Sequence, residues 1–251
     1  LPILCGVAAE VAAGRASWDE TLTLRDADKV SGSGVLTEFA DGTRFTLGDL
    51  ANLMIVVSDN TATNLILDRI PADTVNAFLD TLGLTRTRSL RKVRGDGATL
   101  KPPSGWSAAG KLPDNQRFGI RVLTPREMVR LLELLEQGKV VNAGASARIV
   151  ATLRRQQYKD GIGRRAEDFE VASKSGSLDA LRSDVGIAYT KGGRIAMALT
   201  VDDMPAIDNS PDNAGSVLIW QLSSALIEGL ARRGQRDDPG PPALPQSLQI
   251  D

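Results

Sequence analysis

The sequence contains no histidine among its 251 residues. Histidine is the usual general base at neutral pH and the commonest metal ligand, so its absence excludes Ser-His-Asp and Cys-His mechanisms and histidine-based zinc sites. Any nucleophilic chemistry in this chain must therefore use lysine, tyrosine or a carboxylate as its base.

Cysteine is almost as scarce. Cys5 is the single cysteine, which excludes an intrachain disulfide and a metal site built from several thiolates. Its neighbours Leu4 and Val7 are apolar, whereas reactive thiols need an electropositive, partly exposed setting. We therefore expect a buried structural thiol, no metal site and no cofactor.

Charge of one sign is not in excess either. The formal net charge is −1, which favours neither a nucleic-acid partner nor an acidic membrane surface. The basic residues between 86 and 94 are interpreted as a solvated loop face. No apolar run approaches the length needed to span a bilayer, and no signal peptide is recognised at Leu1.

Residues 1–165 are predicted to form a mostly helical lobe. Residues 86–121 interrupt it with a stretch rich in glycine, proline and basic residues but without periodicity, which predicts a long Ω-like loop. Hydrophobic spacing and start and stop signals predict the helices over 1–13, 50–57, 60–69, 72–82, 124–138 and 145–156.

Residues 166–233 are predicted to form an antiparallel sheet followed by a helix. A Gly-Gly turn at 191–194 joins the last two strands, and the proline-rich residues 234–251 are predicted to be a disordered tail. Helices followed by a meander imply an α/β (α+β) fold, with a helical lobe beside an antiparallel sheet flanked by helices. The predicted strands cover 169–172, 185–189 and 195–201, and the closing helix covers 216–232.

Ser58-Asp59-Asn60 lies between two predicted helices. The serine can pass a proton, the aspartate can hold the loop backbone, and the asparagine can bind an amide of a substrate. The same residue types routinely cap helices, so the tripeptide alone leaves both interpretations open.

Lys174-Ser175-Gly176-Ser177 lies at the end of a predicted strand. The lysine offers a positive charge, Ser175 a donor for a carboxylate, and Gly176 lets a substrate approach the backbone closely. An ordinary polar strand end is the alternative.

Together, and in this order, the two motifs resemble those of class A β-lactamases and their penicillin-binding relatives, whose third motif is Ser-x-x-Lys. The resemblance runs from Leu1 to about Arg233. It implies a serine hydrolase that forms an acyl-enzyme with a β-lactam or a peptidoglycan-like peptide. A monomer is expected, in the periplasm or secreted.

The resemblance also implies roles for individual residues. Ser58 and Lys174 would be catalytic, with Ser58 relaying a proton to the leaving nitrogen and Lys174 supplying positive potential. The substrate would be bound by Asn60, Ser175, Gly176, the backbone N–H of Ser177, which would form half of an oxyanion hole, and Arg182. For Arg182, an ion pair with Asp179 or Asp184 is an equally open alternative.

Two departures from the family pattern affect the expected activity. The nucleophile motif would precede Leu1, since the chain's own Ser-x-x-Lys, Ser89 to Lys92, follows Ser58 and lies in a basic loop. The N-terminal strands of the family would be missing too, which would leave an unprotected sheet edge. No Ω-loop glutamate is present, and Glu127 is interpreted as a helix cap.

Three hypotheses follow. The first is a β-lactamase-family serine hydrolase, with D,D-peptidase or esterase activity as variants. The second is a catalytically inactive relative that binds substrate or peptidoglycan. The third is an unrelated fold whose helix caps imitate the motifs, and it predicts that Ser58 and Lys174 lie far apart.

Overall fold

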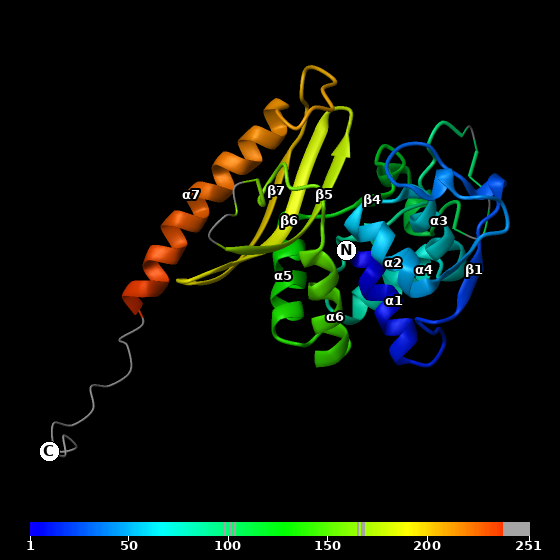
Figure 1. The fold of residues 1–251 in the computed structure, drawn as a ribbon, viewed down its shortest axis with the longest axis horizontal. Helices are drawn as coiled ribbons and strands as arrows, with labels where there is room; N and C mark the ends of the chain where they lie inside the picture. Colours follow the sequence, from blue (N-terminus) through cyan, green and yellow to red (C-terminus); the bar gives the residue numbers. More distant parts are fainter. Residues whose placement is uncertain (98, 101, 103, 165, 167–168, 238–251) are drawn as a thin grey trace, which may run out of the picture.

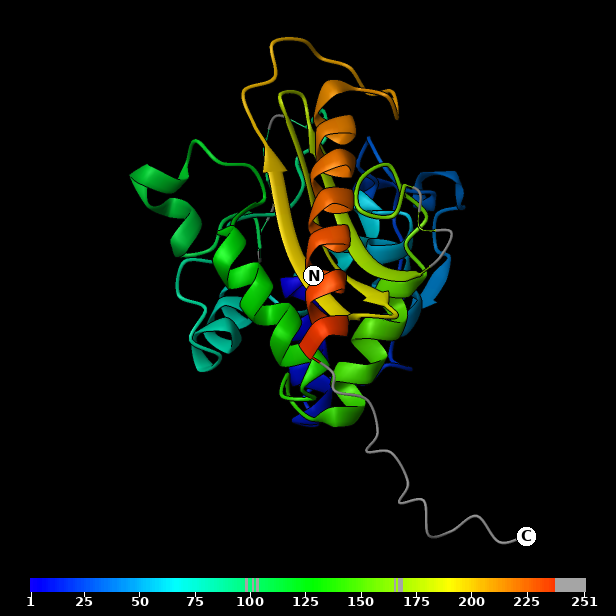
Figure 2. The ribbon, with the colours of Figure 1, turned by 90° about the vertical axis from the view of Figure 1, so that its left-hand side faces the viewer.

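The computed structural model describes all residues except 98, 101, 103, 165, 167–168 and 238–251. The chain forms a helical lobe, which holds α1–α6, and a sheet lobe built on the sheet β5–β6–β7 (Figure 1). The last helix, α7, lies across one face of this sheet, while α5 and α6 pack against the sheet from the helical lobe (Figure 2). The predicted fold class is confirmed.

The helices of the helical lobe follow the predicted pattern closely. The first is buried on all sides from Pro2 to Ala8, because it is apolar nearly all round. Thr46 and Asp49 form a reciprocal capping box at the start of α2. The observed helices are α1 (Pro2–Ala12), α2 (Leu47–Val56), α3 (Asn60–Arg69), α4 (Ala72–Thr81), α5 (Pro125–Glu136) and α6 (Ala143–Arg154).

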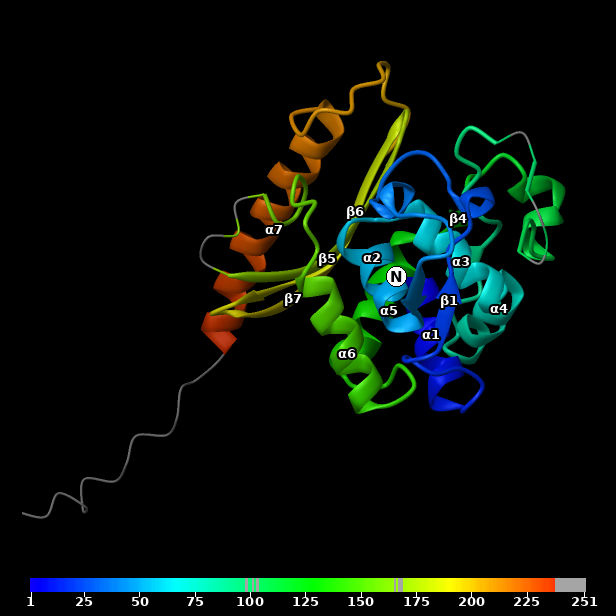
Figure 3. The ribbon, with the colours of Figure 1, turned by 45° about the vertical axis from the view of Figure 1, so that its right-hand side comes forward.

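The sequence did not predict the short elements of this lobe. A strand of two or three residues is too short to show alternating hydrophobicity, so no periodic signal precedes it. The 86–121 loop is held at its two ends by the pairing of β3 with β4. Figure 3 labels β4, at the second of these ends. The short elements are β1 (Thr21–Thr23), β2 (Arg44–Thr46), β3 (Arg88–Ser89), β4 (Arg121–Val122), and the single 3-10 turns η1 (Asp26–Asp28), η2 (Leu36–Glu38), η3 (Ala109–Lys111) and η4 (Pro113–Asn115).

The main sheet is an antiparallel meander of β5 (Glu170–Leu178), β6 (Leu181–Thr190) and β7 (Gly193–Val201). A two-residue turn joins β6 to β7, and Gly193 adopts a φ of 126°, which favours glycine. All three predicted strands are present but longer than predicted. Lys174 therefore lies inside β5, not at its end, with Val185 as its register partner on β6.

The two faces of the sheet belong to two cores. Ala172, Val185 and Ile187 join the core of the helical lobe, whereas Ala188 and Met197 pack with apolar residues of α7. Successive side chains of a strand point to opposite faces. Lys174 therefore faces the helical lobe, and Ser173 and Ser175 face α7.

The closing helix α7 (Ala214–Asp237) extends past Gly234, where the sequence predicted a disordered tail to begin; residues 238–251 lie outside the described residues. Ala214–Ala231 is long and apolar enough by length and composition to cross a membrane, with a mean hydropathy of 1.3, which corrects the expectation that no run approaches this length. Buried Ile219 and Ile227 pack this helix onto the sheet, and helices that cover a core pass the same test.

The outer edge of the sheet is open. In the described part of the chain, β7 pairs with β6 alone. Next to this edge, α7 exposes leucines at intervals of four residues, and four-residue spacing places them on one side of the helix. These are Leu218, Leu222, Leu226 and Leu230, with exposed fractions of 42%, 45%, 40% and 43%.

Candidate active site between the two lobes

Ser58 lies at the tight connection between α2 and α3. Its φ is 54°, in the left-handed region, which costs a non-glycine residue roughly 1–2 kcal/mol. Strained backbone of this kind is found preferentially at functional sites, where neighbouring contacts hold it in place. The conformation is maintained here by the residue that follows.

Asp59 is 1% exposed and bonds three backbone N–H groups. One carboxylate oxygen accepts the N–H of Ala62 at 2.8 Å and so caps α3, while the other accepts those of Val35 at 2.6 Å and Leu36 at 2.9 Å. A methyl group on Gly34 would lie 2.2 Å from this carboxylate, so the loop needs a glycine there. Asp59 therefore has both of the roles that the sequence left open, because it caps α3 and also holds the neighbouring loop.

Asn60 joins the same loop from the first turn of α3. Its side-chain Nδ2 donates to the carbonyl of Ser31 at 2.9 Å, and its backbone N–H donates to the carbonyl of Ser33 at 2.9 Å. These bonds fix the direction of the side chain. Its Oδ1 is the atom that can accept an N–H from a ligand.

Lys174 reaches from β5 to Ser58. Its Nζ donates to Ser58 Oγ at 3.0 Å and to the carbonyl of Ser175 at 2.6 Å. The side chain is buried, and burial lowers the pKa of Lys174 to about 7, with the charge of Arg121 lowering it further and that of Asp184 opposing. The two motifs, 116 residues apart, thus meet across the lobes, which contradicts the unrelated-fold hypothesis.

The rest of the second motif lies along β5, which is an edge strand. Ser175 is opposite Asp184 in the register, and Gly176 is opposite Ser183. A methyl group on Gly176 would lie 3.0 Å from Ser183 Oγ, so glycine keeps this part of the strand open. Ser177 is exposed, and with Gly176 it borders the site along the free edge of β5.

Arg182 does not lie with these residues. It lies on the face of β6 toward α7, where Nη1 donates to the carbonyls of Leu178 and Leu181 and Nη2 donates to the carbonyl of Asp208 and to Asn209. Strand alternation explains the placement, because residues two apart on β6 share a face. As placed, Arg182 anchors the loop before α7, and it makes neither of the predicted ion pairs.

Two charged residues of this region were not assigned to the site from the sequence, and Asp184 was considered only as a possible ion-pair partner of Arg182. Asp184 is buried on the α7 face of β6, and its Oδ2 accepts the N–H of Ile162 at 2.9 Å. Burial raises the pKa of Asp184 to about 6. Arg121 is half-buried on β4, and burial lowers its pKa. A charged residue inside the apolar pattern of a strand, as in Ser183-Asp184-Val185, was the available signal for Asp184.

The second Ser-x-x-Lys does not form a nucleophile site. Ser89 is 3% exposed, and Lys92 forms an ion pair with Asp68 at 2.8 Å. Glu127 differs from a simple cap, since its carboxylate accepts the N–H of Arg86 at 2.9 Å and the hydroxyl of Thr87 at 2.7 Å. Glu127 therefore holds the start of the 86–121 loop.

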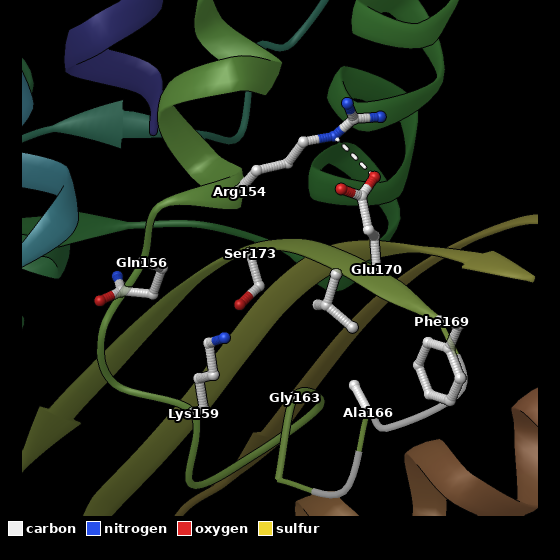
Figure 4. Close-up of a pocket in the computed structure, with 9 residues that line it drawn as sticks. Arg154, Gln156, Lys159, Gly163, Ala166, Phe169, Glu170 and Ser173 are labelled. Carbon is white, nitrogen blue, oxygen red and sulfur yellow. Dashed lines mark ion pairs between the residues drawn. The ribbon is translucent and has the colours of Figure 1, made fainter.

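A separate cavity of about 240 Å³ lies at the other end of β5 (Figure 4). An ion pair between Arg154 and Glu170, 3.6 Å apart, borders it, and Lys159 and Ser173 line it. It includes neither Ser58 nor Lys174. No group of three or more carboxylate or thiol side chains that could hold a metal occurs in the described part of the chain.

Comparison with known proteins gives the same assignment as the geometry. Among solved structures, a β-lactamase from Sphaerobacter thermophilus DSM 20745 is 29% identical with a TM-score of 0.76, over 92% of this chain and 81% of that one. PBP-A is 25% identical with a TM-score of 0.73, over 92% of this chain and 78% of that one. The chromosome-encoded β-lactamase of Vibrio parahaemolyticus, 20% identical over 91% of this chain and 81% of that one, has the same fold with a TM-score of 0.72.

A search of curated proteins finds no match. The profile of the family described as "Beta-lactamase enzyme family" matches residues 1–230. This match covers both motifs and every described element up to the last turns of α7. The chain therefore belongs to the β-lactamase enzyme family.

Proposed function

We propose that this chain provides the substrate-receiving part of a serine hydrolase that forms an acyl-enzyme with a β-lactam or a related amide or ester. The observation that carries the proposal is the 3.0 Å hydrogen bond from Lys174 Nζ to Ser58 Oγ, which joins the two motifs across the lobes. A lysine whose pKa is lowered to about 7 is partly neutral at physiological pH, so it can exchange a proton with Ser58.

Each residue of the site has a role in this scheme. Ser58 passes a proton to the leaving nitrogen, and Lys174 supplies positive potential or takes up the proton. Asn60 Oδ1 accepts an N–H of the substrate's side-chain amide, and Ser175 donates to its carboxylate. The N–H of Ser177, on the free edge of β5, stabilises the oxyanion, and removing such a donor typically costs about 3–4 kcal/mol.

The attacking serine is proposed to belong to a Ser-x-x-Lys motif that precedes Leu1. Leu1 is buried, with 4% of its surface exposed, and α1 begins at the next residue. The N-terminus lies between the sheet and the helical lobe (Figure 1). A chain segment entering there would pass the lysine and the 86–121 loop.

The absence of a glutamate between Arg86 and Arg126 favours slow deacylation. This observation supports the alternatives of a D,D-peptidase, an esterase or an inactive relative that binds peptidoglycan. We also propose a monomer in the periplasm or secreted, as the family resemblance implies.

Nuclear magnetic resonance tests where the substrate binds. Titration of benzylpenicillin into the chain is expected to shift the backbone amides of Ser58, Asn60 and residues 174–177. In the Asn60→Ala variant, the shifts of residues 174–177 should saturate at a higher benzylpenicillin concentration, because one contact with the substrate is lost. Shifts confined to the 240 Å³ cavity, at residues such as Lys159 and Phe169, would contradict the proposed site.

A further inference from the structure

Arg121 is a half-buried arginine without a partner of opposite charge. No carboxylate lies within ion-pair distance of its guanidinium in the part of the chain that the structure describes, and its side chain makes no hydrogen bond there. Burial lowers its pKa, and no acidic group opposes this effect. A half-buried charge that is neither paired nor hydrogen-bonded within the protein is incompletely solvated, so such a group is suited to an anionic ligand.

The guanidinium lies against the second motif. A methyl group placed on Gly176 would lie 3.5 Å from Arg121 Nη2 and 3.0 Å from Ser183 Oγ. The chain just before Arg121 also lies beside β5, since a methyl group on Gly119 would lie 3.9 Å from Cδ1 of Leu178, the last residue of β5. Arg121 therefore stands over the open position that Gly176 leaves on β5.

Arg121 and Lys174 are on the same face of the sheet. The charge of Arg121 is the second-largest influence on Lys174, after burial, and it disfavours the protonated lysine. Asp184, the acid whose charge opposes the lowering of the Lys174 pKa, lies on the opposite face of β6, against Ile162 and α7. Among the described residues, no carboxylate forms an ion pair with Arg121 or Lys174, and an anion would stabilise two basic side chains placed this close together.

The neighbouring arginines, Arg88 and Arg182, already have hydrogen-bond partners. Arg88, which pairs with Val122 beside Arg121, bonds to Asp80 and to the carbonyls of Leu84 and Thr87. Arg182 is bound to backbone carbonyls on the other face of the sheet.

We propose that Arg121 determines specificity by binding the carboxylate of the substrate over Gly176, together with Lys174 and the hydroxyl of Ser183. This assignment rests on the proposed function. It replaces Arg182 with an arginine of the 86–121 loop, and it replaces Ser175, whose side chain faces α7, with Ser183, which is opposite Gly176. The planar guanidinium can bind both carboxylate oxygens at once, which a lysine cannot.

The test compares benzylpenicillin with its methyl ester, which lacks the negative charge. Dissociation constants are measured by titration on the wild-type chain and on Arg121→Gln. The wild type should bind the acid roughly 10- to 100-fold more tightly than the ester, since a hydrogen-bonded charge is typically worth about 1.5–3 kcal/mol. Arg121→Gln should lose most of this preference while its affinity for the ester stays the same.

Two further variants control for folding and for general charge. Arg117→Gln removes an exposed arginine of the same loop, which stacks on Phe118 at 4.8 Å, and it should keep the acid preference. Arg121→Lys keeps the charge but not the two parallel bonds, so its preference should be intermediate. Melting temperatures show that each variant is folded.

The outcomes separate the two proposals. If the wild type binds neither form, the proposed function fails, and the Arg121 assignment fails with it. If it binds both forms equally, or if folded Arg121→Gln or Arg121→Lys keeps the full preference, the site stands and the assignment of Arg121 is overturned.

Discussion

Replacing Asp59 with alanine is expected to lower the free energy of unfolding by roughly 3–5 kcal/mol, because two buried N–H groups and one part-buried N–H group lose their acceptor. These are the N–H groups of Val35, Leu36 and Ala62, all within 2.9 Å of the carboxylate. Natural domains are stable by only about 5–15 kcal/mol, so this loss is large. Denaturation with urea measures it.

The matched control for this experiment is Asp49→Ala. Asp49 also bonds backbone at a helix start, as a member of the Thr46 capping box, but it is exposed. Its replacement should cost about 1 kcal/mol, as for a surface cap. Equal losses in the two variants would show that Asp59 is only a helix cap and that it does not hold the 31–36 loop.

Lys174→Met is expected to destabilise the protein at high pH and to stabilise it at low pH. The folded pKa of about 7 lies below the ordinary 10.5, so the folded protein binds fewer protons than the unfolded chain between these values. The wild type therefore loses stability as the pH falls from about 10.5 to about 7, by on the order of 3–5 kcal/mol, and the methionine variant does not. The variant should be less stable at pH 10, where it lacks two hydrogen bonds, and more stable at pH 6.

Denaturation at pH 6, 8 and 10 measures this reversal. The pKa of Asp184 is raised to about 6, so its ionisation lowers the free energy of unfolding as the pH rises toward 6. This range lies below the pH range of about 7 to 10.5 in which Lys174 acts, so the two effects do not overlap. Lys92→Met is the control, since Lys92 is paired with Asp68 and its loss should destabilise at every one of these pH values. A difference between wild type and Lys174→Met that stays constant with pH would contradict a buried, neutralisable Lys174.

The fold could be predicted from the sequence where local patterns are strong. The apolar first helix, the Thr46 and Thr124 helix starts and the hairpin at Gly192-Gly193 were each found by periodicity or turn chemistry. The short strands β1–β4 were not, because their pairing depends on segments far apart in the chain. The end of α7 was misplaced because Gly234 was interpreted as the start of a tail.

Only those residues of the candidate site that belong to the two sequence motifs could be predicted. Ser58, Asn60 and Lys174 were found because a resemblance connected two short strings, and the structure joins Ser58 to Lys174 directly. Arg182 was assigned to substrate binding by the same resemblance, but the alternation of side chains along β6 places it on the face toward α7. Arg121 could not be identified, since only the fold brings the end of the 86–121 loop over Gly176.

Covalent labelling by a fluorescent penicillin tests the central claim most directly. Residues 1–251 alone should not be labelled, because no serine among those described has the role of the nucleophile. The same chain extended by an upstream Ser-x-x-Lys should be labelled, and Ser58→Ala or Lys174→Met in that protein should slow the reaction by roughly 100-fold or more, as for removed proton-transfer groups. Labelling of residues 1–251, or no labelling of the extended chain, would contradict the account.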